Sequence, residues 1–335
     1  MFAALDPLDR VLIDDYQRAF PLVERPYRMI GADLDIPETE VIRRYDQLIH
    51  MGLITRIGAA LAPNTLGAST LAAMTVPAER IEDVAETVSA EHAVNHNYER
   101  LSGVDSDPNL WFVVTGDCDT AVERSMARIE GMTGLKVLDL RLVEAFHLDL
   151  GFRLSGRDTG RAVTGAVPPD RAAIEPGDTD LMTALEDGLP LVAHPFAAVG
   201  DRLGWPEARV LGRIQALVAG RIIRRFGVIA RHRKLGYRAN AMCVWDIPDD
   251  VASPLGRLLA REEGVTLCYS RRRAEGWPFN LYCMVHATSC DEAMAVHHRL
   301  DAIVGTVARG RRVLFSTRCF KQTGARLSSA ARSAA

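Results

Sequence analysis

The sequence predicts an α+β protein that contains one module twice, each copy being a winged helix-turn-helix followed by a ferredoxin-like βαββαβ domain. The first observation is a repeat: residues 21–67 begin PLVERP and end NTLG, and residues 190–236 begin PLVAHP and end RKLG. After a two-residue slip the match resumes, so that Tyr98 corresponds to Tyr269. The second observation is that helix-like and strand-like patterns follow the same order in both copies.

Each copy begins with three helical patterns and one strand. In the first copy the helices are predicted in residues 9–21, 26–31 and 37–50, and Ile36-Pro37 places a proline at a helix start, where its missing N–H costs little. Gly52 ends the third helix, and LITRIGAALAP is apolar and β-branched enough for a wing strand. Three helices followed by a wing predict a winged helix-turn-helix, and the second copy repeats the pattern.

The rest of each copy alternates between strand and helix in the order βαββαβ, which is typical of a ferredoxin-like domain. The segments predicted in the first copy are 69–77, 79–90, 94–103, 109–116, 118–131 and 135–146. A segment rich in Gly, Arg, Asp and Pro separates the two copies. The predicted parts are 1–62 (winged helix), 63–150 (ferredoxin-like), 151–178 (linker), 179–231 (winged helix), 232–324 (ferredoxin-like) and 325–335 (flexible tail).

Composition predicts a cytoplasmic globular protein. No apolar run reaches the roughly 18 residues of a membrane helix, and the amino-terminal residues lack the pattern of a secretory signal. The six cysteines form no CxxC pair, so we expect buried free thiols in a reducing compartment and no zinc site.

Charge differs between the two halves of the chain. Residues 1–168 contain 16 basic and 26 acidic residues, whereas residues 169–335 contain 24 and 17. Opposite charges favour packing of the halves against each other, and the basic half could line a site for a polyanionic ligand. Random drift of surface charge explains the asymmetry equally well.

The helix-turn-helix raises the question of DNA binding. The candidate recognition helix of the first copy, PETEVIRRYDQLIH, is almost neutral, and that of the second copy has few side chains suited to base edges. Because neutralisation of phosphates supplies most non-specific affinity, we expect DNA binding to be unlikely. A ligand-responsive DNA-binding regulator remains the alternative function.

The copies differ most in two short segments. At the exit of the wing, Arg231–Tyr237 reads RHRKLGY where the first copy has APNTLGA. On the second ferredoxin-like strand the first copy has HNYER, where the second has LCYSR. Each copy therefore has one histidine, His96 or His232, that the other lacks. If the copies pair about a two-fold axis, these histidines could face one composite cleft.

The residue types limit the chemistry of such a cleft. Histidine transfers protons near neutral pH, Arg and Lys hold carboxylates, and aromatic rings flank planar ligands. The sequence has no P-loop, GxGxxG or GxSxG motif and no metal-ligand spacing. This leaves proton chemistry on a large, flat ligand with many carboxylates. Tyr98, Tyr237 and Trp277 could flank a planar ring in such a cleft, beside the distinctive histidines His96 and His232.

Structural roles are the alternative for the histidines. His96 could be a satisfied polar residue on a sheet face, and His232 lies in a basic run of the kind that is usually solvated. His286, His297 and His298 are expected to be strand-core or helix-surface residues with only structural roles.

The architecture resembles the leucine-responsive and asparagine-operon (Lrp/AsnC-like) regulator family, which binds DNA and pairs its ferredoxin-like domains into dimers. Within that superfamily, ITRIGAALAPNTLG, VNHNYER and IIRRFGVIARHRKLGYRANAMCVWDIPD resemble the siroheme decarboxylases, and the two-copy layout resembles the fused form that acts in haem d1 biosynthesis. This resemblance implies non-oxidative removal of the C12 and C18 acetate carboxyls of siroheme, which gives 12,18-didecarboxysiroheme.

The resemblance also implies roles for the site residues. His96 and His232 would deliver protons, or one would bind the iron, while Arg100, Arg231, Arg233, Lys234 and Arg271 would hold carboxylates. The iron would arrive with the substrate, so no other cofactor or protein-bound metal is expected, and a homodimer is expected by analogy. A tetrapyrrole-binding chaperone without chemistry is a third possibility.

Overall fold

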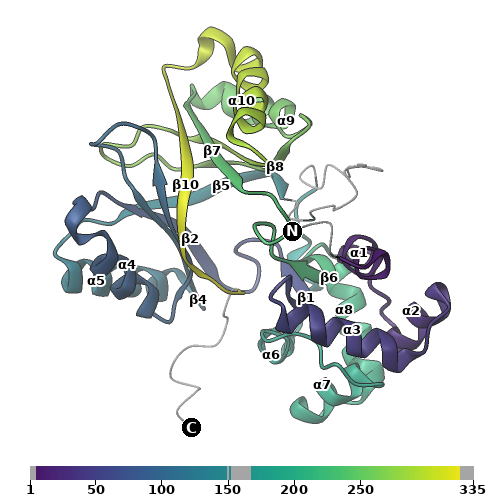
Figure 1. Ribbon diagram of the computed structural model, residues 1–335. Helices are drawn as coiled ribbons and strands as arrows, with labels where there is room; N and C mark the ends of the chain where they lie inside the picture. The colour runs from purple at the N-terminus through teal and green to yellow at the C-terminus, as the bar shows by residue number, and fades with distance from the viewer. Residues whose placement is uncertain (1–4, 149–150, 152–166, 325–335) are drawn as a thin grey trace. The chain divides into compact units, whose positions relative to one another are not determined.

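The computed structural model describes residues 5–148, 151 and 167–324, which form two compact units (Figure 1). The winged-helix unit contains the described residues up to Thr65 together with Gly151 and Pro168–Gly236. The barrel unit contains the described residues from Leu66 onward in the first copy and from Tyr237 onward in the second. Each unit thus takes segments from both copies. The predicted tail and residues 152–166 of the predicted linker lie outside the described residues.

The winged-helix unit contains the predicted helices and strand of each copy. Helix α3 shows why these segments fold: Val41, Tyr45 and Leu48 recur at helical spacing and are completely buried. The elements of the first copy are α1 (Pro7–Asp14), η2 (Asp15–Gln17), α2 (Pro26–Leu34), α3 (Glu38–His50) and β1 (Ile54–Leu61). Those of the second copy are η4 (Arg171–Ala173), α6 (Asp178–Ala184), α7 (Pro195–Leu203), α8 (Glu207–Ala219) and β6 (Ile223–Ala230).

The two wing strands pair with each other. Strands β1 and β6 form an antiparallel two-stranded sheet in which Gly58 lies opposite Gly227. A Cβ atom at Gly227 would lie 2.3 Å from the carbonyl oxygen of Tyr16 and 2.5 Å from that of Gln17. This close approach requires glycine at position 227.

The barrel unit contains the predicted βαββαβ order twice. In the first copy the elements are β2 (Ala68–Met74), η3 (Ala78–Arg80), α4 (Ile81–Ala90), β3 (Val94–Leu101), β4 (Leu110–Gly116), α5 (Asp119–Thr133) and β5 (Leu138–Leu148). In the second copy they are β7 (Ala239–Asp246), α9 (Asp249–Leu259), β8 (Val265–Arg271), β9 (Leu281–Ala287), α10 (Cys290–Val304), η5 (Gly305–Val307) and β10 (Gly310–Gln322).

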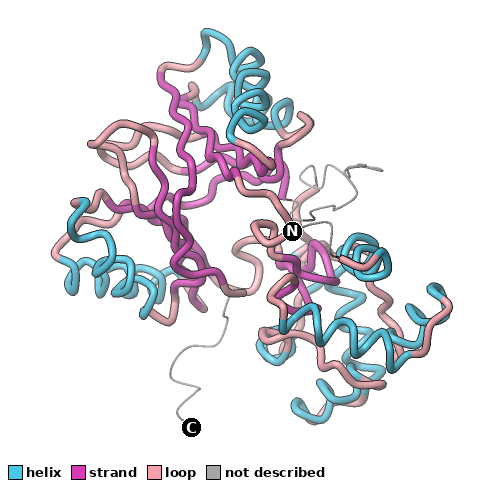
Figure 2. Tube along the Cα trace, viewed as in Figure 1, coloured by secondary structure: helices cyan, strands magenta, loops and turns pink. Residues whose placement is uncertain are grey.

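The eight strands form one closed barrel in the order β10-β3-β4-β2-β5-β8-β9-β7, so the copies meet at the β10–β3 and β5–β8 pairs. Helices α4 and α5 lie outside the strands of the first copy, and α9 and α10 lie outside those of the second (Figures 1 and 2). One apolar core lies under each helix pair, and a third, which includes Trp111, Tyr269 and Trp277, fills the barrel.

Two compositional expectations need correction. Cys243, Cys268 and Cys283 are buried free thiols as expected, but Cys118 and Cys290 at helix starts and Cys319 on β10 are exposed. The charge asymmetry divides the chain by sequence halves, whereas each unit contains parts of both halves, so the asymmetry does not separate one unit from the other. In the part of the chain that the structure describes, no helix is both long and apolar enough to cross a membrane.

Candidate active site

Strand β3 directs His96, Tyr98 and Arg100 to the same face of the sheet. Asn97, which lies between them, faces the other way, because its amide donates hydrogen bonds to the carbonyl oxygen of Ala85 and to Ser89 Oγ, both on α4. Successive side chains of a strand point to opposite faces, so the three predicted residues face the interior of the barrel. The His96 and Tyr98 ring centroids are 6.1 Å apart, and the Arg100 guanidinium carbon is 5.3 Å from the Tyr98 centroid.

His96 is partly exposed and lies beside a β-bulge. The β3–β4 register shifts between Val94 and His96, and bulges often re-aim side chains next to active sites. His96 Nδ1 is 2.9 Å from Asn95 Oδ1. When Nδ1 donates to this amide oxygen, Nε2 is the nitrogen from which an imidazolium proton can be transferred.

Arg100 is buried, with 6% of its surface exposed, and its Nη1 donates a 3.2 Å hydrogen bond to Asn240 Oδ1 on β7. This bond crosses between the two copies of the module. Asn240 was not among the residues predicted from the sequence. Comparison of the two copies could have identified Asn240, because the equivalent residue of the first copy is Ser69 and the two side chains differ.

Strand β8 repeats the tyrosine and the arginine but not the histidine. Arg271 Nη1 donates a 2.6 Å hydrogen bond to the carbonyl oxygen of Leu140, and its guanidinium carbon is 4.5 Å from the Tyr269 ring centroid. The residue equivalent to His96 is Leu267, again beside a bulge. Arg273 does not join this group, because it is paired with Asp246 and Asp249.

The predicted role of Trp277 as a flank for a planar ligand is wrong. Its side chain has 0% exposure, its indole N–H donates a 2.9 Å hydrogen bond to the Tyr282 hydroxyl, and its ring packs edge-on against Trp111 at 5.2 Å. The Trp277 ring is therefore part of the packed core inside the barrel.

The RHRKLGY segment forms a turn at the exit of β6. The Leu235 N–H donates to the carbonyl oxygens of Arg231 (3.1 Å) and His232 (3.0 Å), and the Arg231 N–H donates to the carbonyl oxygen of Leu53 (2.8 Å). Arg231 and Lys234 are exposed, whereas His232 has only 5% exposure. The alternative that His232 belongs to a solvated basic face is therefore wrong.

The predicted residues are divided between the two units. Arg231, His232, Arg233 and Lys234 belong to the winged-helix unit, and Arg233 is partly exposed. Tyr237, also partly exposed, is the first residue that the second copy contributes to the barrel unit, which holds the other predicted residues as well. The composite cleft that we expect for His96 and His232 stays a prediction.

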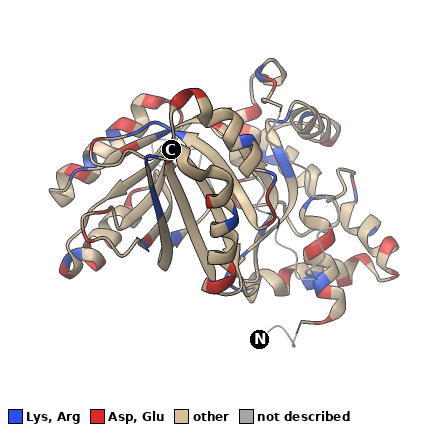
Figure 3. Ribbon diagram, turned by 90° about the horizontal axis from the view of Figure 1, so that it is seen from above, with Lys and Arg blue, Asp and Glu red and all other residues tan. Residues whose placement is uncertain are grey.

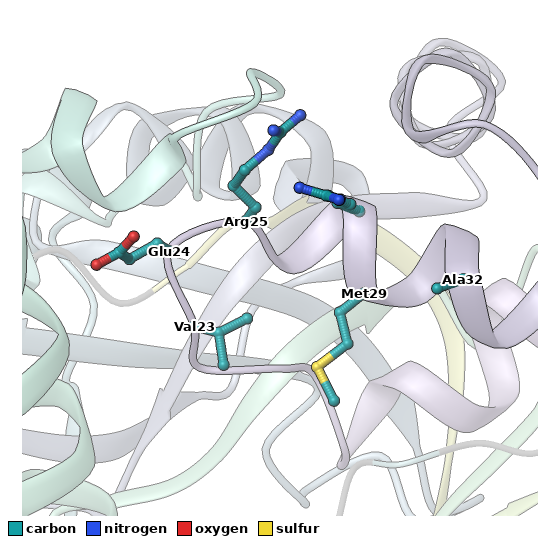
Figure 4. Close-up of a pocket in the computed structure, with 6 residues that line it drawn as sticks. Val23, Glu24, Arg25, Met29 and Ala32 are labelled. Carbon is teal, nitrogen blue, oxygen red and sulfur yellow. The ribbon is translucent and has the colours of Figure 1, made fainter.

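Two surface pockets lie away from all of these residues. One lies beside α2 and has Arg25 at its rim, where Glu38 already pairs with the guanidinium (Figure 4). The other lies on α4 and α5, and its charged residues are all acidic, which does not suit a polyanion. No group of three or more His, Cys, Asp or Glu that could hold a metal ion occurs among the described residues.

Three basic residues of the candidate recognition helices are in ion pairs, whereas Arg209 on α8 lies over the Trp205 ring. On α3, Arg44 pairs with Glu40 at 2.7 Å and with Asp9 at 2.8 Å, and Arg43 pairs with Glu40 at 2.5 Å. These arginines lower the pKa of Glu40 to about 2, first of all through the hydrogen bond from Arg43. On α8, Arg213 pairs with Asp178 at 2.8 Å. Acidic and basic positions are likewise interspersed on the helices in Figure 3.

The fold and these residues define a class: a duplicated winged-helix protein with paired AsnC-like domains. Family models agree with this division. The model of the AsnC-like ligand binding domain matches residues 65–147 and 234–321, and the model of the siroheme decarboxylase NirDL-like HTH domain matches residues 9–54 and 178–224.

Similarity over the whole chain gives the particular family. The siroheme decarboxylase NirDL subunit of Paracoccus pantotrophus is 49% identical, with 96% of this chain and 97% of that protein covered. The corresponding subunit of Paracoccus denitrificans is 47% identical, with 98% and 99% covered. A crystal structure of the siroheme decarboxylase NirDL matches with a TM-score of 0.67 at 25% identity over 97% of this chain and 95% of that one, and a co-complex with an iron-uroporphyrin III analogue matches with 0.66 over the same shares. The chain belongs to the siroheme decarboxylase family and is an enzyme.

Proposed function

We propose that this chain decarboxylates siroheme, removing the acetate carboxyls at C12 and C18 to give 12,18-didecarboxysiroheme for haem d1 biosynthesis. The observation that carries the proposal is similarity to siroheme decarboxylase NirDL subunits along nearly the whole of both chains. The paired basic and aromatic side chains of β3 and β8 add support, because siroheme is flat and carries eight carboxylates.

The chemistry requires one proton for each carboxyl group removed. The bond between the methylene carbon and the carboxylate breaks, carbon dioxide leaves, and the electron pair passes to the methylene carbon with help from the macrocycle. A proton then converts that carbon into a methyl group. His96 is suited to this transfer because its Nδ1 is held by Asn95. His232 is the second candidate donor, and a positioned acid contributes about 10²–10⁴-fold to rate.

The arginines would hold carboxylates that remain on the ring. Arg100 and Arg271 each lie over a tyrosine ring and each use Nη1 for a bond to the protein. Arg231, Arg233, Lys234 and Tyr237 at the exit of the wing would supply further contacts. Such contacts raise the rate by fixing the geometry of the reacting acetate.

No resident cofactor forms part of this proposal, since the reaction is non-oxidative and the iron enters as part of siroheme. A location in the cytoplasm is also part of the proposal, supported by the free thiols.

We keep the expectation of a homodimer. Because the ferredoxin-like sheets of one chain already pair with each other, two chains would have to associate through other surfaces, and light scattering would measure the mass.

The DNA-binding alternative loses support from the ion pairs of Arg43, Arg44 and Arg213, which oppose contact with phosphates. A gel shift at physiological salt would test it, because a regulator binds its operator with a steep salt dependence.

Anaerobic incubation with siroheme, followed by mass analysis of the tetrapyrrole, tests the proposal. Successive loss of one and then two carbon dioxide masses is the expected result. Tight binding of siroheme that stays chemically unchanged would contradict it and favour a carrier role.

A further inference from the structure

We propose that His286 is a positioning residue, which holds Arg100 in a carboxylate-binding orientation through Asn240. The inference rests on the proposed function, because it assigns Arg100 to the binding of a siroheme carboxylate. From the sequence, His286 was expected to be only a strand-core residue, and its 8% exposure on β9 agrees with that location.

A chain of hydrogen bonds joins four strands of the barrel. Arg100 on β3 donates to Asn240 Oδ1 on β7 at 3.2 Å, and Asn240 Nδ2 lies 3.0 Å from His286 Nε2 on β9. His286 Nδ1 lies 2.7 Å from Thr266 Oγ1 next to the bulge of β8. Thr266 Oγ1 in turn donates to the carbonyl oxygen of Met284 at 3.0 Å.

The donors and acceptors of this chain fit in one direction only. Thr266 uses its hydroxyl hydrogen on Met284, so its oxygen accepts from His286 Nδ1–H. His286 Nε2 then has a lone pair and accepts from the Asn240 amide, whose oxygen is consequently turned toward Arg100. The neutral imidazole thus fixes which end of the Asn240 side chain faces the guanidinium.

Orientation matters because Arg100 is a nearly buried cation. A rotated Asn240 amide would present its NH₂ group to the guanidinium, placing donor against donor. The bond to a charged group would then be lost, and the guanidinium would move away from its present position over the Tyr98 ring.

This chain belongs to one half of the duplication. The positions equivalent to Asn240, Thr266 and His286 in the first copy are Ser69, Asn95 and Thr115. Thr115 Oγ1 donates to the backbone carbonyl of Ala93, and the arginine equivalent to Arg100 bonds to a backbone carbonyl. The second copy therefore supplies the side chains that orient an arginine of the first.

The test is a double-mutant cycle on affinity for iron-uroporphyrin III, with turnover of siroheme measured in parallel. His286→Leu should weaken binding about tenfold to a hundredfold, the effect of losing a hydrogen bond to a charged group. Arg100→Met should weaken it at least as much. In the double variant His286→Leu should add less than about twofold, because it acts through Arg100.

Three further variants separate positioning from a general packing role. His286→Gln keeps an acceptor for Asn240 and a donor for Thr266, so it should restore binding to within about threefold of wild type. Asn240→Leu should reproduce the loss without altering His286, which keeps the test valid if His286→Leu does not fold. Thr115→Val is the matched control, since it removes a polar group at the equivalent position of the first copy and should leave binding unchanged.

The outcomes distinguish failure of the inference from failure of the proposed function. If wild type decarboxylates siroheme but the His286→Leu and Arg100→Met effects are additive, or Asn240→Leu binds like wild type, the positioning role is overturned. If wild type binds no iron tetrapyrrole and leaves siroheme unchanged, the proposed function itself is wrong.

Discussion

Strands β3 and β8 occupy equivalent places in the two copies, yet they differ in one side chain that can transfer a proton. Both have a bulge near the start, a tyrosine in the middle and an arginine over that tyrosine. Only β3 adds a histidine, His96, where β8 has Leu267. An arginine–tyrosine pair is present on both strands, whereas the histidine is present on one.

This difference between β3 and β8 indicates that the two copies took on different roles after the duplication. A symmetric pair of domains presents two similar arginine–tyrosine pairs, as suits a ligand with carboxylates all around its rim. The histidine and the Asn240 contact make one of the two arginine environments different.

Replacing the histidine of β3 should have the largest effect. We expect His96→Ala to lower kcat for siroheme decarboxylation by about 10²-fold or more, because the acid is lost, with little change in affinity. Leu267→Ala on β8 is the matched variant and should keep turnover. Steady-state assays with titration of iron-uroporphyrin III separate the two quantities, and equal turnover in the two variants would remove the proposed role of His96.

The exits of the two wings offer a second contrast. His232→Asn should lower kcat about 10²-fold, since it removes the other candidate donor from a buried position. Pro63, the equivalent residue of the first copy, has no such chemistry, so Pro63→Ala should keep turnover. Normal kcat in His232→Asn would restrict proton transfer to β3.

The two arginines should contribute unequally to binding. Arg100 is buried and bound by Asn240, so Arg100→Met should weaken affinity for iron-uroporphyrin III about tenfold to a hundredfold. Arg271 is only partly buried, and Arg271→Met should weaken it about threefold to tenfold. Calorimetric titration measures both, and a larger loss for Arg271→Met would reverse the assignment of the stronger carboxylate contact.

Two facing glycines give a contrast in stability. Gly227→Ala should lower the free energy of unfolding by about 2 kcal/mol, because the new Cβ would meet two backbone carbonyls of the first copy. At Gly58 the nearest atom to a new Cβ would be 3.5 Å away, so Gly58→Ala should change the free energy of unfolding by less than about 0.5 kcal/mol. Denaturant melts of the two variants test this, and similar midpoints would contradict the close approach at position 227.

The β10–β3 seam should give a small, pH-dependent effect. Glu99 accepts two hydrogen bonds from Arg318, at 2.8 and 2.9 Å, and these lower the pKa of its carboxyl below the ordinary value of 4.5. Because the folded-state pKa is the lower one, the stabilisation is present above pH 4.5 and is lost as pH falls through the folded pKa. Glu99→Gln should cost about 1 kcal/mol at pH 7, since Arg318 is partly exposed.

Melts across the pH range provide the control for that prediction. The difference between wild type and Glu99→Gln should shrink toward zero at acid pH. A difference that stays constant with pH would show that the lost stability comes from packing and not from the carboxylate charge.

Local patterns predicted the helices and strands well because they depend on residues close together in the chain. The periodicity of Val41, Tyr45 and Leu48 defines α3, and alternation defines β3 with His96, Tyr98 and Arg100 on one face. Comparison of the copies also identified His96 and His232 as distinctive without any knowledge of their surroundings.

The remaining features depend on contacts between distant segments. The pairing of β1 with β6 joins strands about 170 residues apart, and the Arg100–Asn240–His286 contacts depend on the register of β3, β10, β7 and β9. Trp277 shows the same limit: an aromatic residue in a loop fits a ligand site equally well until its 0% exposure is known.

We infer that equivalent strands of one chain supply different parts of one siroheme decarboxylase. The most direct measurement is anaerobic incubation of siroheme with wild type, His96→Ala and Leu267→Ala in parallel, followed by mass analysis of each tetrapyrrole. We predict loss of two carbon dioxide masses with wild type and Leu267→Ala, and intact, bound siroheme with His96→Ala. Complete decarboxylation by His96→Ala, or none by wild type, would show that β3 does not supply the proton donor.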